Sequence, residues 1–269
     1  MATITAKDVM ALRKASGLGM MEAKKALTET GGDMEAAKEL LRKKGLAKMD
    51  GRTDRESAEG KVAIAVSDDK KKGAIVLVNT ETDFTANNDM FIEKVQIIAN
   101  QALTNDLGEV AVDDSITTLI DDIRVTTKEN AQFGKGMVLG GDNATIGSYL
   151  HFTGKVGVLI ELEGEASEEL CKDLCMHVSA ISPAPLGVNE DEVPADILEK
   201  EREIAKAQAM ESGKPEEIAE KMVEGKIRKY LDEVTLMRQK FVKDDKKQIK
   251  DILPAGVSIK KFVRYQIGG

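Results

Sequence analysis

The chain is poor in aromatic residues and has fewer positive than negative charges. Its 269 residues include no tryptophan, and aromatic residues make up only 3% of the total. Proteins that bind single-stranded nucleic acids stack bases on aromatic side chains, and such platforms are scarce here. The 39 lysines and arginines are outnumbered by 47 aspartates and glutamates, which leaves a net charge of −8. Nucleic-acid binders usually carry a basic face, so the composition favours a protein partner over direct contact with nucleic acid and leaves room only for a local basic patch.

Cysteines and long apolar runs are also scarce. Cys171 and Cys175 are the only cysteines, too few for a disulfide framework. No apolar run reaches the roughly 18 residues that a membrane-spanning helix needs, and the N-terminal residues turn charged too early for a signal peptide. We therefore expect no contact with membranes and a cytoplasmic or equally reducing compartment. The length predicts two or three folded units.

Residues 1–46 predict a domain of three short helices. Thr5 and Asp8 have the spacing of a reciprocal N-terminal cap, and glycines at positions 17, 19, 31 and 32 separate the helices. Gly45 fits a C-terminal cap of the third helix. The apolar face predicted for the second helix consists of Met20, Ala23 and Leu27. A charged segment with almost no large apolar residues follows at 47–60 and predicts a linker.

The rest of the chain twice repeats the order of a β-hairpin followed by a helix. The predicted strands lie at 62–66, 73–78, 146–152 and 156–162, and the predicted helices at 90–103 and 167–181. A further helix is marked by isoleucines at positions 116, 120 and 123, and a last strand is predicted at 257–267. The expected fold class is therefore α+β, with two tandem subdomains of antiparallel hairpins and helices at 61–140 and 141–269.

Residues 195–231 predict an antiparallel helical hairpin inserted in the second subdomain. Two highly charged helices meet at Gly213-Lys214-Pro215, where a glycine follows one helix and a proline starts the next. The thin apolar seam is predicted to comprise Ile197, Ile204 and Ala207 or Gln208, facing Ile218, Met222 and Tyr230 or Leu231. A helix pair this polar is expected to project as a coiled coil rather than to lie in a core.

No catalytic or metal-binding set is recognised, which predicts a protein that is not an enzyme and holds no metal or cofactor. Cys171, Cys175 and His177 are spaced like metal ligands. On a helix, however, only the two cysteines share a face, so we expect buried packing residues. The glycines of Gly134-Lys135-Gly136 and Gly140-Gly141 lack the spacing of a phosphate-binding loop, and a flexible connection is expected there.

The most informative segment is Asn79 to Phe91, which reads NTETDFTANNDMF. It predicts a short polar loop between a β-branched strand and an apolar helix, with one large apolar residue, Phe84, at its centre. Two interpretations stay open from the residues alone. The ring folds back onto the chain's own core, as loop aromatics often do, or it enters a pocket on a partner. Asp83 places a carboxylate next to the ring, which suits a site that disturbs both the packing and the charge of a partner.

This segment and three others closely resemble the elongation factor Ts family, which exchanges the nucleotide on the GTPase elongation factor Tu. The resembling segments are Leu12 to Thr30, Asn79 to Phe91, Gly147 to Leu159 and Ser212 to Tyr230. They follow the family's order over nearly the whole chain. The resemblance implies a ubiquitin-associated-like N-terminal domain. It also implies a guanine-nucleotide exchange factor that binds the GDP form of elongation factor Tu and loosens its Mg²⁺ and phosphate contacts.

The resemblance assigns roles to individual residues of the loop. Thr82, Asp83, Phe84 and Thr85 match the family residues that dislodge the Mg²⁺ of the partner GTPase. The usual family pattern has a valine where Thr85 stands, so a hydroxyl is added here to a side chain of similar shape. Some family members also carry an additional C-terminal helix that contacts the partner, and we expect this chain, which ends at Gly268-Gly269, to lack that contact.

Further contacts with the GTPase are implied at three other places. On its own, His151 reads as a surface or turn histidine. It is the histidine of a GSYLH segment at 147–151, and in the family the matching histidine approaches the phosphate-binding loop of the GTPase. The remaining implied contact residues are Phe133 with Gly134, at the position of an apolar-glycine pair of the family, and Met20, Met21 and Lys24, which open the second N-terminal helix.

Two other classes of function stay open on the sequence. One is an interaction adaptor whose N-terminal helices bind a protein client without any effect on nucleotide. The other is an enzyme that itself hydrolyses or transfers nucleotide, and the lack of a recognised phosphate-binding motif counts against it. Release of GDP from the GTPase separates an exchange factor from an adaptor. Binding of labelled GDP to the isolated chain is the observation that would support an enzyme.

Overall fold

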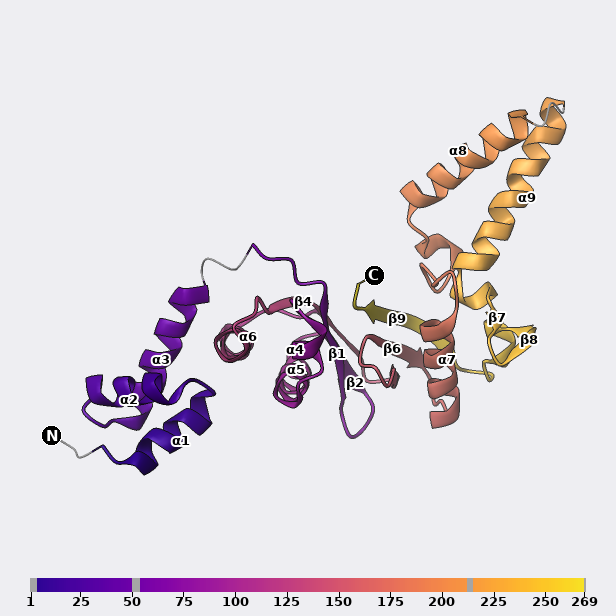
Figure 1. Cartoon of the computed structure of the whole chain (residues 1–269). Coiled ribbons are helices and arrows are strands. Elements are labelled where there is room, and N and C mark those ends of the chain that lie inside the picture. The colour runs from indigo at the N-terminus through magenta and orange to yellow at the C-terminus, as the bar shows by residue number, and fades with distance from the viewer. Residues whose placement is uncertain (1–3, 50–53, 212–214, 269) are drawn as a thin grey trace. The chain divides into compact units, whose positions relative to one another are not determined.

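The computed structural model describes residues 4–49, 54–211 and 215–268 (Figure 1). The parts of the predicted linker at 50–53 and of the predicted helical junction at 212–214 lie outside the described residues. The chain divides into two compact units, each built from separate stretches of sequence. The first unit comprises Met1–Ala63, Val76–Met137 and Gln266–Gly269, and the second comprises Ile64–Ile75 and Val138–Tyr265. No helix among the described residues is both long and apolar enough to cross a membrane.

An all-helical start is followed by mixed helices and strands. Up to the fourth strand the elements are α1 (Ala6–Ser16), α2 (Met20–Glu29), α3 (Met34–Met49), β1 (Glu59–Val66), β2 (Lys72–Thr80), α4 (Asp83–Ala86), α5 (Asp89–Ala102), β3 (Gly108–Glu109), α6 (Asp114–Thr127) and β4 (Gln132–Gly140). They are followed by β5 (Ala144–Leu150), β6 (Val156–Glu163), α7 (Glu168–Ala180), η2 (Glu190–Glu192), α8 (Ala195–Glu211), α9 (Glu216–Val234), η3 (Leu236–Arg238), β7 (Lys240–Phe241), β8 (Asp244–Gln248), α10 (Ile249–Ile252) and β9 (Ser258–Gln266). The predicted α+β class, with an N-terminal helix bundle and antiparallel sheets, is confirmed.

The three N-terminal helices form a bundle with its own small core. The predicted cap is present, because the backbone N–H of Asp8 donates to Oγ1 of Thr5 at 3.3 Å and that of Thr5 donates to Oδ2 of Asp8 at 2.9 Å. The prediction that Met20 belongs to the core is wrong, since 42% of it is exposed. The buried face of α2 is made by Ala23, Ala26 and Leu27, and Met20 lies at the margin of that face.

Gly45 does not end α3, contrary to the prediction, because the helix continues to Met49. A Cβ atom at Gly45 would lie 2.6 Å from Cγ1 of Val125, a residue of α6 that is buried in the core of the bundle. The glycine is therefore needed for the close approach of α3 and α6 rather than for a change of chain direction. Gly17 does end its helix as predicted, with a φ of 67° in the left-handed region.

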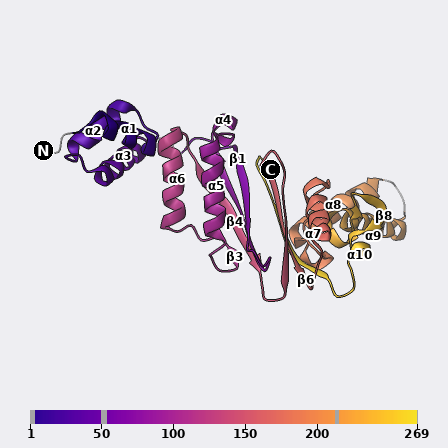
Figure 2. The same ribbon diagram turned by 90° about the horizontal axis from the view of Figure 1, so that it is seen from below.

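The four-stranded sheet has the strand order β1-β2-β4-β3. Strand β4 corrects the prediction of a flexible connection at the glycines after position 133. Gly134 allows close strand packing, since a Cβ atom there would lie 2.5 Å from Oδ1 of Asn79 and 2.7 Å from Cδ2 of Leu77. Helices α5 and α6 pack against each other (Figure 2). The large side chains that they bury completely are Phe91, Ile98, Ile116 and Ile123.

In the second unit, helix α7 covers a three-stranded sheet of order β5-β6-β9. Strands β5 and β6 are antiparallel, with partners from Ala144 and Glu163 to Leu150 and Gly157. A Cβ atom at Gly147 would lie 2.8 Å from Cγ2 of Ile160 and 2.9 Å from Cβ of Cys171, so this glycine lets α7 lie close to the strands. The short elements η2, η3, β7, β8 and α10 were not predicted from the sequence.

Helices α8 and α9 run antiparallel and extend away from α7 in the same unit (Figure 1). The predicted seam is confirmed at Met222 and Leu231, which pack against the buried residues, and is wrong at Ile204 and Ile218. The buried seam residues are Ala205, Ala209, Val223 and Ile227. By contrast, Ile204 and Ile218 are 50% and 46% exposed. Alanines on α8 allow the two backbones to approach closely. The close packing that results is more favourable than burial of the bulkier Ile204 beside them.

Candidate partner-contact site

Strand β2 ends at Thr80, and one turn of helix, α4, follows it and carries Asp83 and Phe84. Thr82 is the N-cap, because its Oγ1 accepts a hydrogen bond from the backbone N–H of Thr85 at 3.3 Å. The helical turn corrects the prediction of an irregular loop. A threonine at the cap followed by an aspartate in the first turn is a typical start of a helix, even one this short.

Phe84 points away from the protein, and 85% of it is exposed. This contradicts the alternative in which the ring folds back onto the chain's own core. Asp83 is exposed beside it, whereas Thr85 and Ala86 are buried. The turn thus has an outward pair and an inward pair of residues, and it presents an apolar ring and a carboxylate to solvent together.

The carboxylate of Glu129 accepts hydrogen bonds from threonines on both sides of this outward pair. Its Oε2 accepts from Oγ1 of Thr80 at 2.8 Å and from the backbone N–H of Thr82 at 3.1 Å. Its Oε1 accepts from Oγ1 of Thr82 and from Oγ1 of Thr85, both at 2.7 Å. The hydroxyl that distinguishes Thr85 from the usual valine therefore has a partner. We call Glu129 and these three threonines the Glu129 clamp.

Two opposing effects act on the pKa of Glu129. Burial favours the neutral acid and so raises the pKa, while the hydrogen bonds from Thr82, Thr85 and Thr80 favour the carboxylate. The hydrogen bonds prevail, and the pKa of Glu129 lies below its ordinary value. The clamp is therefore held by a charged carboxylate, whose hydrogen bonds are stronger than those between neutral groups.

The segment that carries Glu129 is itself fixed to its surroundings. The backbone N–H of Asn130 donates to Oε1 of Glu81 at 2.7 Å, and its side-chain Nδ2 donates to the backbone oxygen of Arg55 at 2.7 Å. Oγ of Ser57 donates to the backbone oxygen of Asn130 at 2.5 Å. Residues 129 and 130 therefore join the end of β2 to the chain that precedes β1. The sequence reasoning missed Glu129, because nothing local to position 129 marks a contact with residues 44 to 49 positions earlier.

His151 follows β5 at the tip of the β5–β6 hairpin and is half-buried. Its Nδ1 lies 2.8 Å from Oγ1 of Thr153, and its backbone N–H donates to the backbone oxygen of Val156 at 2.9 Å. The backbone N–H of Gly154 donates to the backbone oxygen of His151 at 2.8 Å. The imidazole is therefore oriented by its own turn.

Phe152, next to His151, was not singled out from the sequence, yet it is 91% exposed. Its ring centre lies 4.4 Å from that of His151. The same signal that marked Phe84, an aromatic residue among turn-forming polar residues, was available here in the sequence HFTGK. Leu150 is 42% exposed on the same hairpin. This tip therefore offers an apolar surface beside an imidazole ring.

The other predicted contact residues lie on α2 and β4. At the start of α2, Met21 is 75% exposed and Lys24 is exposed as well. On β4, Phe133 is half-buried, and Gly134 lies beside Asn79 near the end of β2 from which the Phe84 turn departs. The structure thus brings Gly134 and the Phe84 turn to neighbouring positions on β2. Met20, Met21 and Lys24 belong to the helical bundle, and His151 belongs to the second unit.

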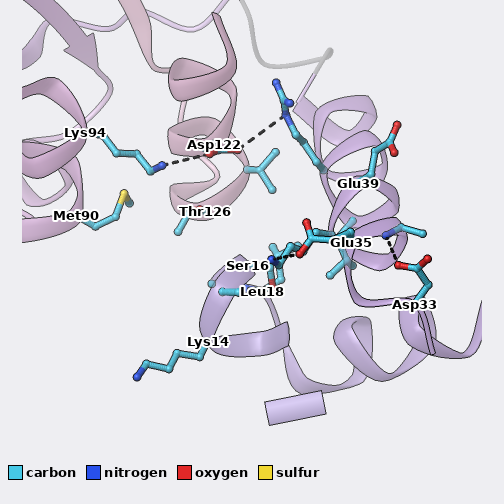
Figure 3. Close-up of a pocket in the computed structure, with 17 residues that line it drawn as sticks. Lys14, Ser16, Leu18, Asp33, Glu35, Glu39, Met90, Lys94, Asp122 and Thr126 are labelled. Carbon is cyan, nitrogen blue, oxygen red and sulfur yellow. Dashed lines mark hydrogen bonds and ion pairs between the residues drawn. The ribbon is translucent and has the colours of Figure 1, made fainter. Parts of the chain in front are cut away.

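Figure 3 shows the cavity where α1 and α3 of the bundle meet α5 and α6. Asp122 lies between two cations there, 3.2 Å from Nζ of Lys94 and 3.9 Å from Nε of Arg42. Nη2 of Arg42 also lies 3.4 Å from Oδ2 of Asp121. Because the charges on these helices pair with one another, the cavity is best explained as a structural junction. It ties the bundle to α6, the helix that ends just before Glu129.

Cys171, Cys175 and His177 belong to the core of the second unit. Both thiols are buried, and burial raises the pKa of each. Burial lowers the pKa of His177, although a hydrogen bond between Nε2 and Oε1 of Gln239 at 3.1 Å opposes that shift. Nδ1 accepts from the backbone N–H of Val242 at 3.3 Å, so both ring nitrogens are used in packing. Within the described ranges, no group of three or more histidine, cysteine or acidic residues has the arrangement of a metal site.

Comparison with known proteins gives one answer throughout. A model of the family described as Elongation factor TS matches residues 81–269. The elongation factor Ts of Halorhodospira halophila is 44% identical over 274 residues, covering 99% of this chain and 92% of that protein. The one of Thioalkalivibrio sulfidiphilus is 44% identical over 282 residues, with the same coverage, and the one of Chlorobaculum parvum is 41% identical over 289 residues that cover both chains completely. The chain therefore belongs to the elongation factor Ts family, whose identity supports a role as a nucleotide-exchange factor in translation elongation.

Proposed function

We propose that this chain is a guanine-nucleotide exchange factor that acts on the GTPase elongation factor Tu. It binds the GDP form, disturbs the contacts of Mg²⁺ and of the phosphates, and lets GDP leave so that GTP can bind. The observation that carries the proposal is the 85% exposure of Phe84 on a turn whose other residues are buried or hydrogen-bonded. An exposed ring on a fixed turn is suited to insertion into a partner, and the cytoplasm is the compartment where this exchange would take place.

The required free energy shows that Phe84 does not act alone. By linkage, the factor and the nucleotide must weaken each other's binding to the GTPase equally. An acceleration of GDP release by three to four decades needs about 4–5.5 kcal/mol of selective stabilisation of the releasing state. Burial of one phenylalanine provides roughly 1.5–3 kcal/mol. At least one further contact must therefore favour the distorted GTPase.

Asp83 and His151 are the residues proposed to supply the rest of the free energy that stabilises the releasing state. The exposed carboxylate of Asp83 would meet the magnesium region of the partner, where an added negative charge competes with the ligands of the ion. His151, oriented by Thr153, would approach the phosphate-binding loop. Thr82 and Thr85 hold the turn. The anchoring contacts are proposed at Met20, Met21, Lys24, Phe133 and Gly134.

The test is release of a fluorescent GDP from elongation factor Tu in a stopped-flow instrument, with the factor at increasing concentration. Phe84→Ala is expected to lower the maximal release rate by about ten- to a hundredfold, since burial of the ring is lost, while the half-saturating concentration changes less. Leu107→Ala, which truncates another exposed apolar residue of the same unit, is the matched control. An unchanged maximal rate in the Phe84 variant would remove the ring from the mechanism. No release with the unaltered chain would favour an adaptor instead.

A further inference from the structure

We infer that Glu129 is a positioning residue of the exchange site: its carboxylate fixes the α4 turn, so that Asp83 and Phe84 are presented to the partner in one orientation. This inference rests on the proposed function, because it concerns the conformation that the same turn has before the partner binds. Glu129 itself is set behind the turn and is not proposed to touch the GTPase or its nucleotide.

The geometry of the donors supports this assignment. The hydrogen bonds that reach Glu129 start from Thr80, Thr82 and Thr85, which stand before and after the outward pair Asp83 and Phe84. One carboxylate thus fixes the end of β2, the N-cap of α4 and the buried third residue of the helical turn. Each of its two oxygens accepts two hydrogen bonds, at 2.7–3.1 Å. The turn cannot rotate about the β2 end without breaking several of these bonds together.

The turn needs this external support because it is very short. α4 comprises four residues, and the backbone bonds that close it run from the N–H groups of Ala86, Asn87 and Asn88 to the oxygens of Thr82, Asp83 and Thr85, at 3.1, 2.9 and 3.0 Å. A single helical turn does not stabilise itself in water, since nucleation orders several residues for very few hydrogen bonds. The exposed ring of Phe84 adds no packing within the chain. The Glu129 clamp therefore adds to the packing of Thr85 and Ala86, the two residues of this turn that are buried.

The backbone that carries Glu129, the acceptor of these bonds, is itself held by hydrogen bonds. Lys128 ends α6 in the left-handed conformation, with a φ of 63°, and its N–H donates to the backbone oxygen of Arg124 at 2.8 Å. The backbone N–H of Glu129 donates to Oγ1 of Thr127 at 3.2 Å. Together with the hydrogen bonds of Asn130, these contacts fix the Glu129 backbone, so the carboxylate is held by the end of α6 rather than by a free loop. A contact presented in its binding conformation loses less conformational entropy when the partner binds.

The first arm of the experiment uses the isolated chain. Because the sequence has no tryptophan, Phe84→Trp places a single fluorescent indole on the turn. We expect Glu129→Gln to lower the fluorescence anisotropy of this indole, because a neutral amide cannot accept the same set of hydrogen bonds. Glu93→Gln removes one charge from an exposed position on α5 and should leave the anisotropy unchanged. An unchanged anisotropy in the Glu129 variant would overturn the inference whatever the exchange assay shows.

The second arm measures GDP release from elongation factor Tu in four proteins: unaltered, Glu129→Gln, Phe84→Ala and the double variant. A positioning role predicts that Glu129→Gln lowers the maximal rate about tenfold, with a half-saturating concentration changed less than about threefold. In the Phe84→Ala background the same change should matter less than about twofold, because the ring that Glu129 orients is gone. Equal losses in both backgrounds, or no loss in the first, would overturn the inference.

These arms separate failure of the inference from failure of the proposed function. If Phe84→Ala leaves release unchanged, the proposed function of the ring fails, while the anisotropy still reports whether Glu129 fixes the turn. Thr85→Val is the second variant in case Glu129→Gln does not fold, since it keeps the shape of the side chain and removes one of the donors. It should lower the maximal rate in the same direction, by about two- to fivefold. An unchanged rate in a folded Thr85 variant would mean that the hydrogen bond from Thr85 to Glu129 does not help to position the turn.

Discussion

Two tips of this protein present an exposed phenylalanine, and they are held in different ways. Phe84, at the end of β2, is 85% exposed on a turn whose flanks are hydrogen-bonded to Glu129. Phe152, at the end of β5, is 91% exposed on a hairpin whose contacts run between His151, Thr153 and the local backbone. The first tip is thus fixed by a residue from a distant part of the sequence. The second is fixed within five or six residues of itself.

This difference bears on what each tip can do to a partner. A turn that is fixed by charge-assisted hydrogen bonds keeps its conformation when a partner binds. The partner must then change its own conformation to accommodate the turn. A hairpin tip that depends on its own turn adjusts more readily and is suited to adhere. We therefore expect the Phe84 ring to alter the nucleotide site and the Phe152 ring, as distinct from His151 beside it, to add binding. Each prediction below tests this division of roles.

The largest effect is expected from overpacking β4 against β2, the strand that leads into the Phe84 turn. Gly134→Val would place a side chain in steric overlap with Asn79 and Leu77 on β2, just before the Phe84 turn, since even its Cβ atom would lie 2.5 and 2.7 Å from their side-chain atoms. We expect overpacking to lower the free energy of unfolding by about 1–3 kcal/mol and the maximal rate of GDP release with it. Urea unfolding followed by circular dichroism measures the first. Gly141→Val is the matched control, since a Cβ there meets nothing within 4 Å. Equal stability losses in both variants would contradict close packing at Gly134.

The same contrast explains how much of the molecule the sequence could reveal. Elements set by local signals were predicted, as at the Thr5–Asp8 cap and in the helix at 90–103, which forms as α5. Features set by distant neighbours were not predicted. Gly45 fits a helix end in the sequence because its contact with Val125 lies 80 positions away. Gly134 fits a flexible connection because its neighbours on β2, Leu77 and Asn79, lie 57 and 55 positions away.

The candidate site follows the same rule. The residues of the Phe84 turn alone leave two interpretations open, and the 85% exposure of the ring decides between them. Glu129 could not be found, because a glutamate that follows a helix is ordinary until the fold brings it beside three threonines. In the helical hairpin, the sequence predicts that Ile204 lies in the seam. The helices instead bury Ala205 and Ala209, whose small side chains allow close approach.

A smaller effect is expected at the second tip. Phe152→Ala removes a ring that is almost fully exposed, so the free energy of unfolding should change by less than about 0.5 kcal/mol. If this tip only adds binding, the half-saturating concentration for GDP release should rise about two- to fivefold at an unchanged maximal rate. The concentration dependence of release measures both values. A maximal rate that falls as far as in Phe84→Ala would erase the distinction between the two tips.

A further effect is expected in the pH dependence of the first tip. The folded pKa of Glu129 lies below its reference value of 4.5, so its stabilising contribution is fully present above pH 4.5 and is lost as the pH falls through the folded pKa. Glu129→Gln has no such titration. The difference in unfolding free energy between the two proteins, about 1 kcal/mol at neutral pH, should therefore shrink below pH 4.5. Urea titrations at pH 7, 5, 4 and 3.5 test this, with Glu93→Gln as the exposed control. A difference that stays constant to pH 3.5, or one that grows as the pH falls, would mean that the clamp does not depend on a charged carboxylate, and the contrast between the two tips would lose its electrostatic basis.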